Sequence, residues 1–478
     1  MGIRIQPREI DVPEDDPFKN DLLGRKEPAE VLTHLVGSIE GSCVLAVDAA
    51  WGAGKTTFLK IWSQHLRKQG FPVVEFNAWE TDHSGDPFVA LSSELTEGLQ
   101  EYKDEPLVQK IDETKKAAKE VFRRAVPGII RVTTAGILDV SPLIEKELGQ
   151  TLASYAKARL SEYQEAQKSV NTFRNVLQDM AGTLSEAHVN RPLIVVIDEL
   201  DRCRPSYAVE LLEVAKHLFS VENIVFVLAV NRSELGHSIK ALYGSGFDAE
   251  GYLRRFFDVD FRLPEPERDA FITAMLDAIQ INDYFTRTRD RFAASHASTV
   301  RAWLLGFFDE PDLSLRRIVQ AIHRLGLVFA SLRSDRTSLA LVTVVALIVR
   351  TIDSDLYYRF VRGEVSDLDV SDMVFDRPGG RALQEKYGDY FEMILIRSRM
   401  EITSSSSSEL WQKYKGIVDA EEPDRVSGDL DQDYANQVIE LLRNSSLTGV
   451  GFKAAAQRLE LLSPDLIEEH TGAASNDS

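Results

Sequence analysis

Short apolar runs alternate with longer amphipathic segments over the first 265 residues of the chain. The runs that we predict to be strands are residues 44–47, 72–76, 193–197, 223–230 and 258–263. The two runs at 193–197 and 223–230 lack polar alternation, which is typical of strands covered on both faces. Segments between the runs, such as 58–68, carry apolar residues at helical spacing. This alternation predicts an α/β domain with a largely parallel sheet.

The pattern changes at about residues 94–190, where Lys, Glu, Ala and Gln dominate long helical repeats. We expect a large, partly coiled helical insertion between two strands of one sheet, and its simplest interpretation is a solvated arm without chemistry of its own. The insertion divides a core domain over 21–265, which follows an extended, charged and proline-rich leader over 1–20. We predict a helical lid over 266–358, then a mixed C-terminal region of unknown role over 359–478 that ends in a disordered tail.

The chain is acidic, because 55 Lys and Arg stand against 75 Asp and Glu and leave a formal net charge of −20. Phosphate backbones are bound by Lys and Arg, so this balance disfavours a nucleic-acid partner, although a local basic groove stays possible. Only two cysteines, Cys43 and Cys203, are present. Together with an N-terminus that does not resemble a secretion signal, they predict a reducing, cytoplasmic location.

Two apolar stretches approach the length of a membrane span. Residues 339–349 are short and closed in by Arg336 and Arg350, which favours a buried core helix. Residues 125–144 are interrupted by charged residues and prolines, so we expect no span there either. An interfacial or partner-buried segment stays an alternative for this second stretch.

A glycine-rich loop, AAWGAGKTT, lies directly between the first predicted strand and the helix after it. Gly54, Lys55 and Thr56 occupy the defining positions of the phosphate-binding pattern G-x-x-x-x-G-K-[ST], in which Ala49 replaces the first glycine. Lys55 can reach the β- and γ-phosphates, and the Thr56 hydroxyl can bind Mg²⁺. The residues expected to contact the nucleotide here are Ala50, Trp51, Gly52, Ala53, Gly54, Lys55, Thr56 and Thr57.

Two acids, Asp198 and Glu199, end the predicted strand at 193–197. An Asp at the carboxyl end of a strand near the phosphate loop can hold the Mg²⁺ shell. A Glu directly after it can orient and deprotonate an attacking water. This pair favours hydrolysis of a bound nucleotide over transfer of its phosphoryl group to an acceptor.

Further polar residues are candidates for sensing or stabilising the reaction. Asn231 closes the strand FVLAV and can either contact the γ-phosphate or attacking water, or cap the helix that begins at Arg232. Arg254 and Arg255 precede the last predicted strand, and a guanidinium there could stabilise the transferring phosphoryl group of the same or a neighbouring subunit. Arg316 and Arg317 open a helix of the predicted lid and could bind the nucleotide. For each of these arginines, the alternative is that it is a solvated surface residue with no role in the site.

Seven segments resemble the motifs of KAP-type P-loop NTPases, which are related to AAA+ and STAND ATPases. They are DLLGRKEPAEVL, WGAGKTT, FNAWE, LIVVIDELDRCRP, FVLAVNRSEL with GYLRRFFDVDFRLP, and LSLRRIVQAIHRL, and they cover about residues 20–330. The resemblance implies an AAA+-like P-loop fold of the branch that uses a catalytic glutamate. It further implies ATP binding by the Gly52–Thr56 loop, Mg²⁺ binding by Thr56 and Asp198, and catalysis by Glu199.

The chain departs from the family pattern at several points. Glu199 and Asn231 stand where many members have Asp, and Ala49 replaces a glycine whose loss is tolerated if the backbone φ is negative. Many members carry transmembrane helices in the insertion, whereas 125–144 is too polar and too broken to span.

We therefore expect an oligomerising ATPase that couples hydrolysis to a conformational or assembly switch. The resemblance implies prokaryotic antiviral defence as its setting, since some bacterial members exclude phages. Partner proteins or further copies of the chain would contact the helical insertion or the C-terminal region. The alternatives are a nucleotide-gated signalling scaffold with negligible turnover and a P-loop kinase.

Overall fold

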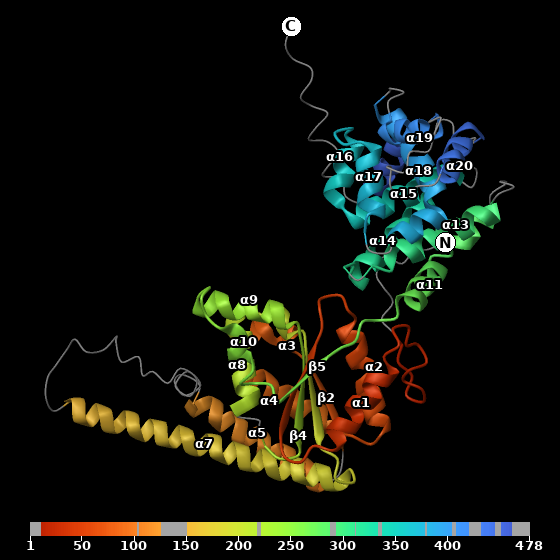
Figure 1. Ribbon diagram of the computed structural model, residues 1–478. Coiled ribbons are helices and arrows are strands. Elements are labelled where there is room, and N and C mark those ends of the chain that lie inside the picture. The colour runs from red at the N-terminus through yellow and green to blue at the C-terminus, as the bar shows by residue number, and fades with distance from the viewer. Residues whose placement is uncertain are drawn as a thin grey trace. The chain divides into compact units, whose positions relative to one another are not determined.

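The computed structural model describes most of the chain and divides it into two compact units, Glu9–Pro266 and Glu267–Ser478 (Figure 1). The described residues are 11–102, 105–125, 151–217, 221–286, 293–310, 312–332, 337–377, 380–403, 408–419, 432–444 and 451–460. Each unit is described below by itself.

A five-stranded parallel sheet forms the centre of the first unit. Its strands are β1 (Cys43–Asp48), β2 (Val73–Asn77), β3 (Leu193–Asp198), β4 (Ile224–Val230) and β5 (Val259–Arg262). Their order across the sheet is β2-β3-β4-β1-β5. The predicted α/β architecture and all five predicted strands are confirmed. Because β4 lies between β1 and β3, the loop after β1 and the acids after β3 meet at one edge of the sheet.

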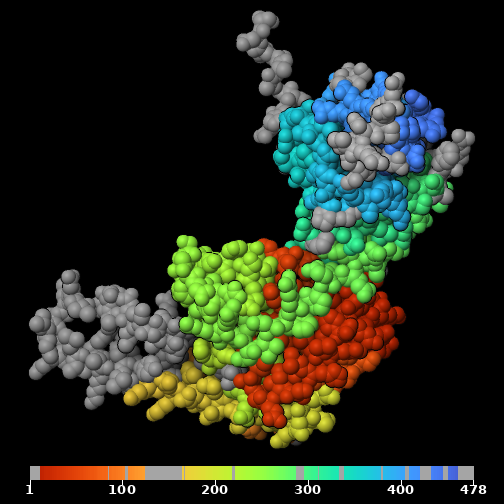
Figure 2. All heavy atoms as spheres, viewed as in Figure 1, coloured from red at the N-terminus to blue at the C-terminus, as the bar shows by residue number. Residues whose placement is uncertain are grey.

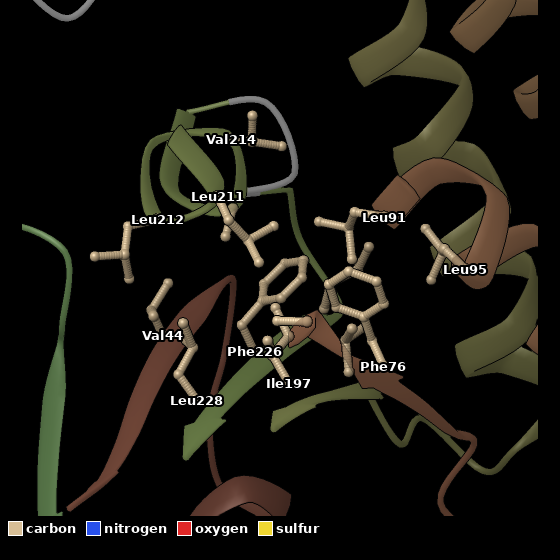
Figure 3. Packing of buried hydrophobic residues seen from close by; sticks show 14 of the residues in the cluster. Val44, Phe76, Leu91, Leu95, Ile197, Leu211, Leu212, Val214, Phe226 and Leu228 are labelled. Carbon is tan, nitrogen blue, oxygen red and sulfur yellow. The ribbon is translucent and has the colours of Figure 1, made fainter. Parts of the chain in front are cut away.

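Helices cover both faces of this sheet, as the apolar strand runs require. On one face, α1 (Lys26–Gly37) and α2 (Lys55–Lys68) pack against alternate strand residues such as Leu45 and Val227. On the other, Phe76, Ile197 and Phe226 point toward leucines of the covering helices (Figure 3). The helices of this second face are α4 (Pro87–Gly98), α8 (Pro205–His217), α9 (Arg232–Tyr243) and α10 (Ala249–Leu253).

The insertion consists, in its described part, of α5 (Glu105–Ala125) and the long α7 (Thr151–Ala187), which lie side by side (Figure 1). Figure 2 shows the atoms of α7, in yellow, along the outer edge of the first unit. Ile111 and Val121 of α5 and Phe173 and Leu177 of α7 are buried in the same core cluster as the sheet. The interpretation of the insertion as a solvated arm is therefore wrong for this part of α5 and α7, which belongs to the core.

The predicted apolar stretch 125–144 lies outside the described residues except for Ala125. None of the helices that the structure describes combines the length and the apolar character needed to cross a bilayer.

The regular elements in the described residues of the second unit are all helices, connected by turns and short loops. They are α11 (Arg268–Ala278), α12 (Ile281–Thr286), α13 (Ala293–Phe308), α14 (Leu315–Ser331), α15 (Thr337–Ile352), α16 (Ser354–Val361), α17 (Asp367–Phe375), α18 (Gly380–Ile402), α19 (Glu409–Asp419), α20 (Gln432–Asn444) and α21 (Phe452–Glu460). Residues 339–349 are fully buried within α15, which confirms the predicted core helix.

The C-terminal region, which we predict to be mixed, has helices as its only regular elements within the described residues. The helix α16 runs across the predicted boundary between residues 358 and 359. The predicted disordered tail, GAASNDS at 472–478, and the first ten residues of the predicted leader lie outside the described residues.

Candidate nucleotide-binding site

The phosphate-binding loop connects β1 to α2 and takes its shape from two glycines. Gly52 and Gly54 have φ values of 79° and 85°, in the left-handed region that side chains with a Cβ disfavour. Ala49 still belongs to the sheet edge, since its N–H donates to the Val230 carbonyl at 3.1 Å. It is not among the described residues with positive φ, so alanine replaces the first glycine of the motif without strain.

Lys55 opens α2 and is buried at the base of the loop. Its ammonium group donates to the Ala49 carbonyl at 2.7 Å and lies 3.3 Å from a carboxylate oxygen of Asp201. The same oxygen of Asp201 accepts from the indole N–H of Trp51 at 2.9 Å. The lysine of the phosphate-loop motif is thus paired with an acid of this chain. Of the other predicted contact residues, Ala50 is exposed, while Ala53 and Thr57 are half-buried in and just after the loop.

Thr56 and Asp198 come together across β4 as the predicted metal ligands. The Thr56 hydroxyl hydrogen-bonds to the Asp198 carboxylate, whose Oδ1 also accepts from the Glu199 N–H at 2.8 Å. Burial raises the pKa of Asp198 above its ordinary value, and these hydrogen bonds oppose that effect. A hydroxyl and a carboxylate side by side fit Mg²⁺, which usually takes one or two protein ligands and completes its shell with water and phosphate oxygens.

A metal site made of protein ligands alone is not present in the described part of the chain. No group of three or more His, Cys, Asp or Glu side chains there is arranged to hold an ion.

Glu199 adopts a left-handed backbone conformation, with φ 60° and ψ 24°, directly after β3. Such a conformation is strained for a residue with a side chain and is often found at functional sites. Its carboxylate pairs with the Arg202 guanidinium at 2.7 Å, and that guanidinium lies 5.8 Å from the ring centre of Trp79. The predicted water-activating acid is therefore held by a cation from the 3₁₀ turn η3 (Leu200–Arg202).

Trp79 follows β2 in the short helix α3 (Ala78–Thr81), and Asn77 fixes the start of that helix. The Asn77 side chain accepts from the backbone N–H groups of Trp79 and Glu80, at 3.1 and 3.4 Å. Asn77 is also the register partner of Asp198 across β2 and β3. The FNAWE motif thus places an exposed aromatic ring beside the acidic pair.

Asn231 caps α9, which is one of the two roles the sequence leaves open. Its side-chain oxygen accepts from the Glu234 N–H at 3.4 Å, and its own backbone N–H donates to Asp201 at 3.0 Å. Cys203 directly follows η3 and is buried, and this burial raises the pKa of its thiol to about 12. It contributes packing, as expected from the sequence.

Two of the four candidate arginines lie in the first unit and two in the second. Arg254 is exposed and pairs with Glu250 at 3.1 Å, and Arg255 is exposed directly after α10. Arg316 and Arg317 are exposed in the first turn of α14, in the second unit, where Arg317 donates to the Thr351 carbonyl at 2.6 Å.

Two residues that support the site were not predicted from the sequence. Arg25 is 1% exposed, and its guanidinium donates to the Ala53 carbonyl in the loop at 2.9 Å and to the carbonyl of Pro264. Asp201 gathers Trp51, Lys55 and the Asn231 N–H on one oxygen. The motifs DLLGRKEPAEVL and DELDRCRP contain both residues, so the signal was present without an assigned role.

Comparison with known proteins agrees with this geometry. Residues 25–330 match the family model described as the KAP family P-loop domain. The Phage T7 exclusion protein of Escherichia coli strain K12 is 24% identical over 241 residues, which are 48% of this chain and 31% of that protein. The matched region thus spans about a third of that relative's length.

Among solved structures, the Aeropyrum pernix ORC2 protein in its ADPNP-ADP complexes aligns over 88% of this chain and 94% of its own, with 13% identity and a TM-score of 0.32. The family model covers well over half of the chain and includes the phosphate-binding loop and the acids at the end of β3. The chain therefore belongs to the KAP family of P-loop NTPase domains.

Proposed function

We propose that this protein binds ATP with Mg²⁺, hydrolyses it, and uses the cycle as a conformational or assembly switch in defence against phages. The observation that carries the proposal is the position of Glu199. It follows Asp198 at the carboxyl end of β3, and β4 separates this strand from β1, which leads into the phosphate loop. Thr56 and Asp198 meet at the same end of the sheet.

Each group at this edge has a defined task. The loop N–H groups and Lys55 bind the phosphate chain, and Thr56 and Asp198 hold Mg²⁺, which neutralises phosphate charge when bound. Glu199 orients a water molecule and accepts its proton. Its Oε1 pairs with Arg202 at 2.7 Å, and a carboxylate has acceptor sites on two oxygens, so the same group can bind the water and Arg202 together.

Other elements supply the switch. Asn231 joins β4 to α9 and could report the state of the γ-phosphate through the start of that helix. Arg254 or Arg255 could act on a neighbour's nucleotide if copies assemble, and Arg316 and Arg317 could close on the nucleotide from α14. The helices α5 and α7 and the C-terminal helices offer surfaces for further copies or for an effector protein.

Similarity to one relative supports the proposed biological setting. A protein named for exclusion of phage T7 is 24% identical to this chain over 241 residues, and this supports phage defence as its role.

A second candidate function is a nucleotide-gated scaffold that binds ATP with negligible turnover. The specific observation in its favour is that both reactive groups are occupied by partners from the chain itself. Lys55 is paired with Asp201, and Glu199 with Arg202. Hydrolysis would then require an activator that rearranges η3.

Phosphate release by the purified full chain with ATP and Mg²⁺ tests the proposal. We expect Glu199→Gln to retain ATP and to lower release by at least about a hundredfold, since a general base contributes factors of this order. Lys55→Ala should abolish ATP binding. Glu97→Gln, the same change at an exposed position on α4, is the matched control and should behave as wild type.

Three other outcomes are informative. Release that persists in Glu199→Gln would remove Glu199 as the base. ATP binding without release from the wild type would favour the scaffold. Stimulation by added DNA or RNA would identify a nucleic-acid partner despite the net charge of −20.

A further inference from the structure

Asp201 is a buried carboxylate at the centre of the site that none of the assigned steps uses. Its side chain is 3% exposed and that of Lys55 is 9% exposed, so their contact at 3.3 Å is shielded from bulk water. One oxygen, Oδ2, faces three donors: the Lys55 ammonium, the Trp51 indole N–H and the Asn231 backbone N–H. These donors come from the phosphate loop, from the start of α2 and from the end of β4.

The charge of this carboxylate opposes nucleotide binding. Lys55 can offer three N–H donors, and Ala49 and Asp201 already engage two of them. A triphosphate that reaches Lys55 brings several negative charges close to Asp201, in surroundings where charges interact more strongly than in water. Phosphate and Asp201 thus compete for the same cation.

We propose that Asp201 is a positioning residue that serves as the counter-ion of Lys55 before nucleotide binds, and that the phosphates of ATP displace it from this role. This inference rests on the proposed ATP binding and adds the residue that sets its affinity. When Lys55 turns to the phosphates, Asp201 keeps only its bonds to Trp51 and to the Asn231 N–H. The arrival of phosphate is thereby transmitted to an exposed indole and to the first turn of α9.

Asp201→Asn separates the charge from the geometry. An amide has nearly the same shape, and its carbonyl can still accept from Trp51 and from the Asn231 N–H, but it no longer neutralises Lys55. Direct binding measurements on the full chain should show ATP bound about tenfold more tightly, which corresponds to about 1.4 kcal/mol. The gain should be smaller for ADP and absent for AMP, because AMP does not reach Lys55.

The matched control is Asp82→Asn. Asp82 also pairs with a cation, Arg204, at 3.0 Å, but it does not contact Lys55. The ATP affinity of the Asp82→Asn variant should stay within about twofold of the wild type. Weaker or unchanged ATP binding by Asp201→Asn, or an equal gain for AMP, would overturn the proposal, since general structural damage weakens binding and does not sort nucleotides by charge.

Tryptophan emission tests the transmission step independently. ATP should change the emission of the wild type, and Trp51→Phe should remove that change. A change that persists in Trp51→Phe, or no change in the wild type under conditions where ATP binds, would overturn the link to Trp51.

A stability comparison keeps the pairing testable if Asp201→Asn does not fold alone. Lys55→Met leaves a buried acid without its cation, which is strongly destabilising. Adding Asp201→Asn to Lys55→Met should therefore restore stability, whereas additive losses would contradict the pairing. This comparison needs neither ATP nor turnover. If the wild type did not hydrolyse ATP, the proposed function would be contradicted, but the pairing of Asp201 with Lys55 could still be tested.

Discussion

At the scale of single residues, Arg25 joins the segment before the sheet to the phosphate-binding loop. Its buried guanidinium satisfies the carbonyls of Ala53 and Pro264. Arg25→Met keeps the unbranched apolar part of the side chain but removes the guanidinium and leaves both carbonyls without this donor. We expect the free energy of unfolding of the first unit to fall by about 2–4 kcal/mol, measured by urea denaturation. ATP affinity should also fall, since Ala53 forms part of the loop.

Lys26→Met is the control for Arg25→Met, because it removes the neighbouring cation, which is exposed and 3.9 Å from Glu30. Such surface pairs contribute little, so this variant should lie within about 0.5 kcal/mol of wild type. Equal losses in the two variants would show that the Arg25 contacts do not support the loop.

Residue-level analysis could locate features that belong to one local motif, and it could not locate contacts between residues far apart in the chain. The loop glycines and the acids after β3 could be identified because strand, loop and helix lie consecutively in the chain. Arg25 and Pro264 are 239 residues apart, and Trp51 and Asp201 are 150 apart. No period or motif relates residues at these distances, so only the folded chain shows that they meet.

At the scale of elements, the two helices of the insertion differ sharply between their buried and exposed faces. Phe173 of α7 is fully buried and meets the ring of Phe88 edge-on at 5.2 Å, whereas Phe122 of α5 is 48% exposed. Phe173→Ala should lower the free energy of unfolding by about 3–5 kcal/mol. The identical change at Phe122 should cost less than about 1 kcal/mol. Urea denaturation of both variants measures the difference.

A small effect of Phe173→Ala would mean that α7 does not share the core of the sheet.

The buried faces of α5 and α7 could not be predicted from the sequence for a physical reason. Long helices rich in Lys, Glu and Ala owe that composition to their exposed face, and the few apolar residues that pack inward are diluted in the average. The strands were easier to predict, because burial on both faces leaves almost no polar residues in them.

At the scale of the whole molecule, the family region and the compact units do not coincide. Residues 25–330 match the KAP domain, while the first unit ends at Pro266. The helices α11 to α14 therefore belong to the family by sequence and to the helical unit by packing. The boundary that the sequence predicts between core and lid, at residues 265 and 266, lies beside this division. The second predicted boundary, at 358 and 359, falls inside α16, because amphipathic helices continue through it without a change of period. Arg316 and Arg317 lie in this shared region, which is why their proposed contact with nucleotide needs a direct test.

The second unit is organised around a buried acid, Glu392 of α18. It accepts from Gln384 at 2.9 Å, from Tyr414 at 2.6 Å, and from Ser371 and Tyr434, which lie on α17 and α20. Burial raises the pKa of Glu392 above its ordinary value, and the four hydrogen bonds oppose that effect only in part. The network therefore joins four helices through one carboxyl group.

This raised pKa predicts how the stability of the second unit depends on pH. The folded state holds the proton of Glu392 more tightly than the unfolded chain does, so the proton contributes stability fully below the unfolded pKa, about 4.3. That contribution is lost as pH rises from there through the raised folded pKa. Glu392→Gln stays neutral throughout, so its unfolding free energy should decline less than that of wild type over this window.

Urea denaturation of wild type and Glu392→Gln at a series of pH values from about 4.5 to 8 measures the difference, and subtraction cancels every other titrating group. Glu385→Gln, at an exposed position of the same helix, should run parallel to wild type. If the curve of Glu392→Gln also ran parallel to wild type, the carboxyl would keep the same protonation on folding. The four hydrogen bonds would then outweigh burial, and the network would hold a charged carboxylate at the junction of its helices.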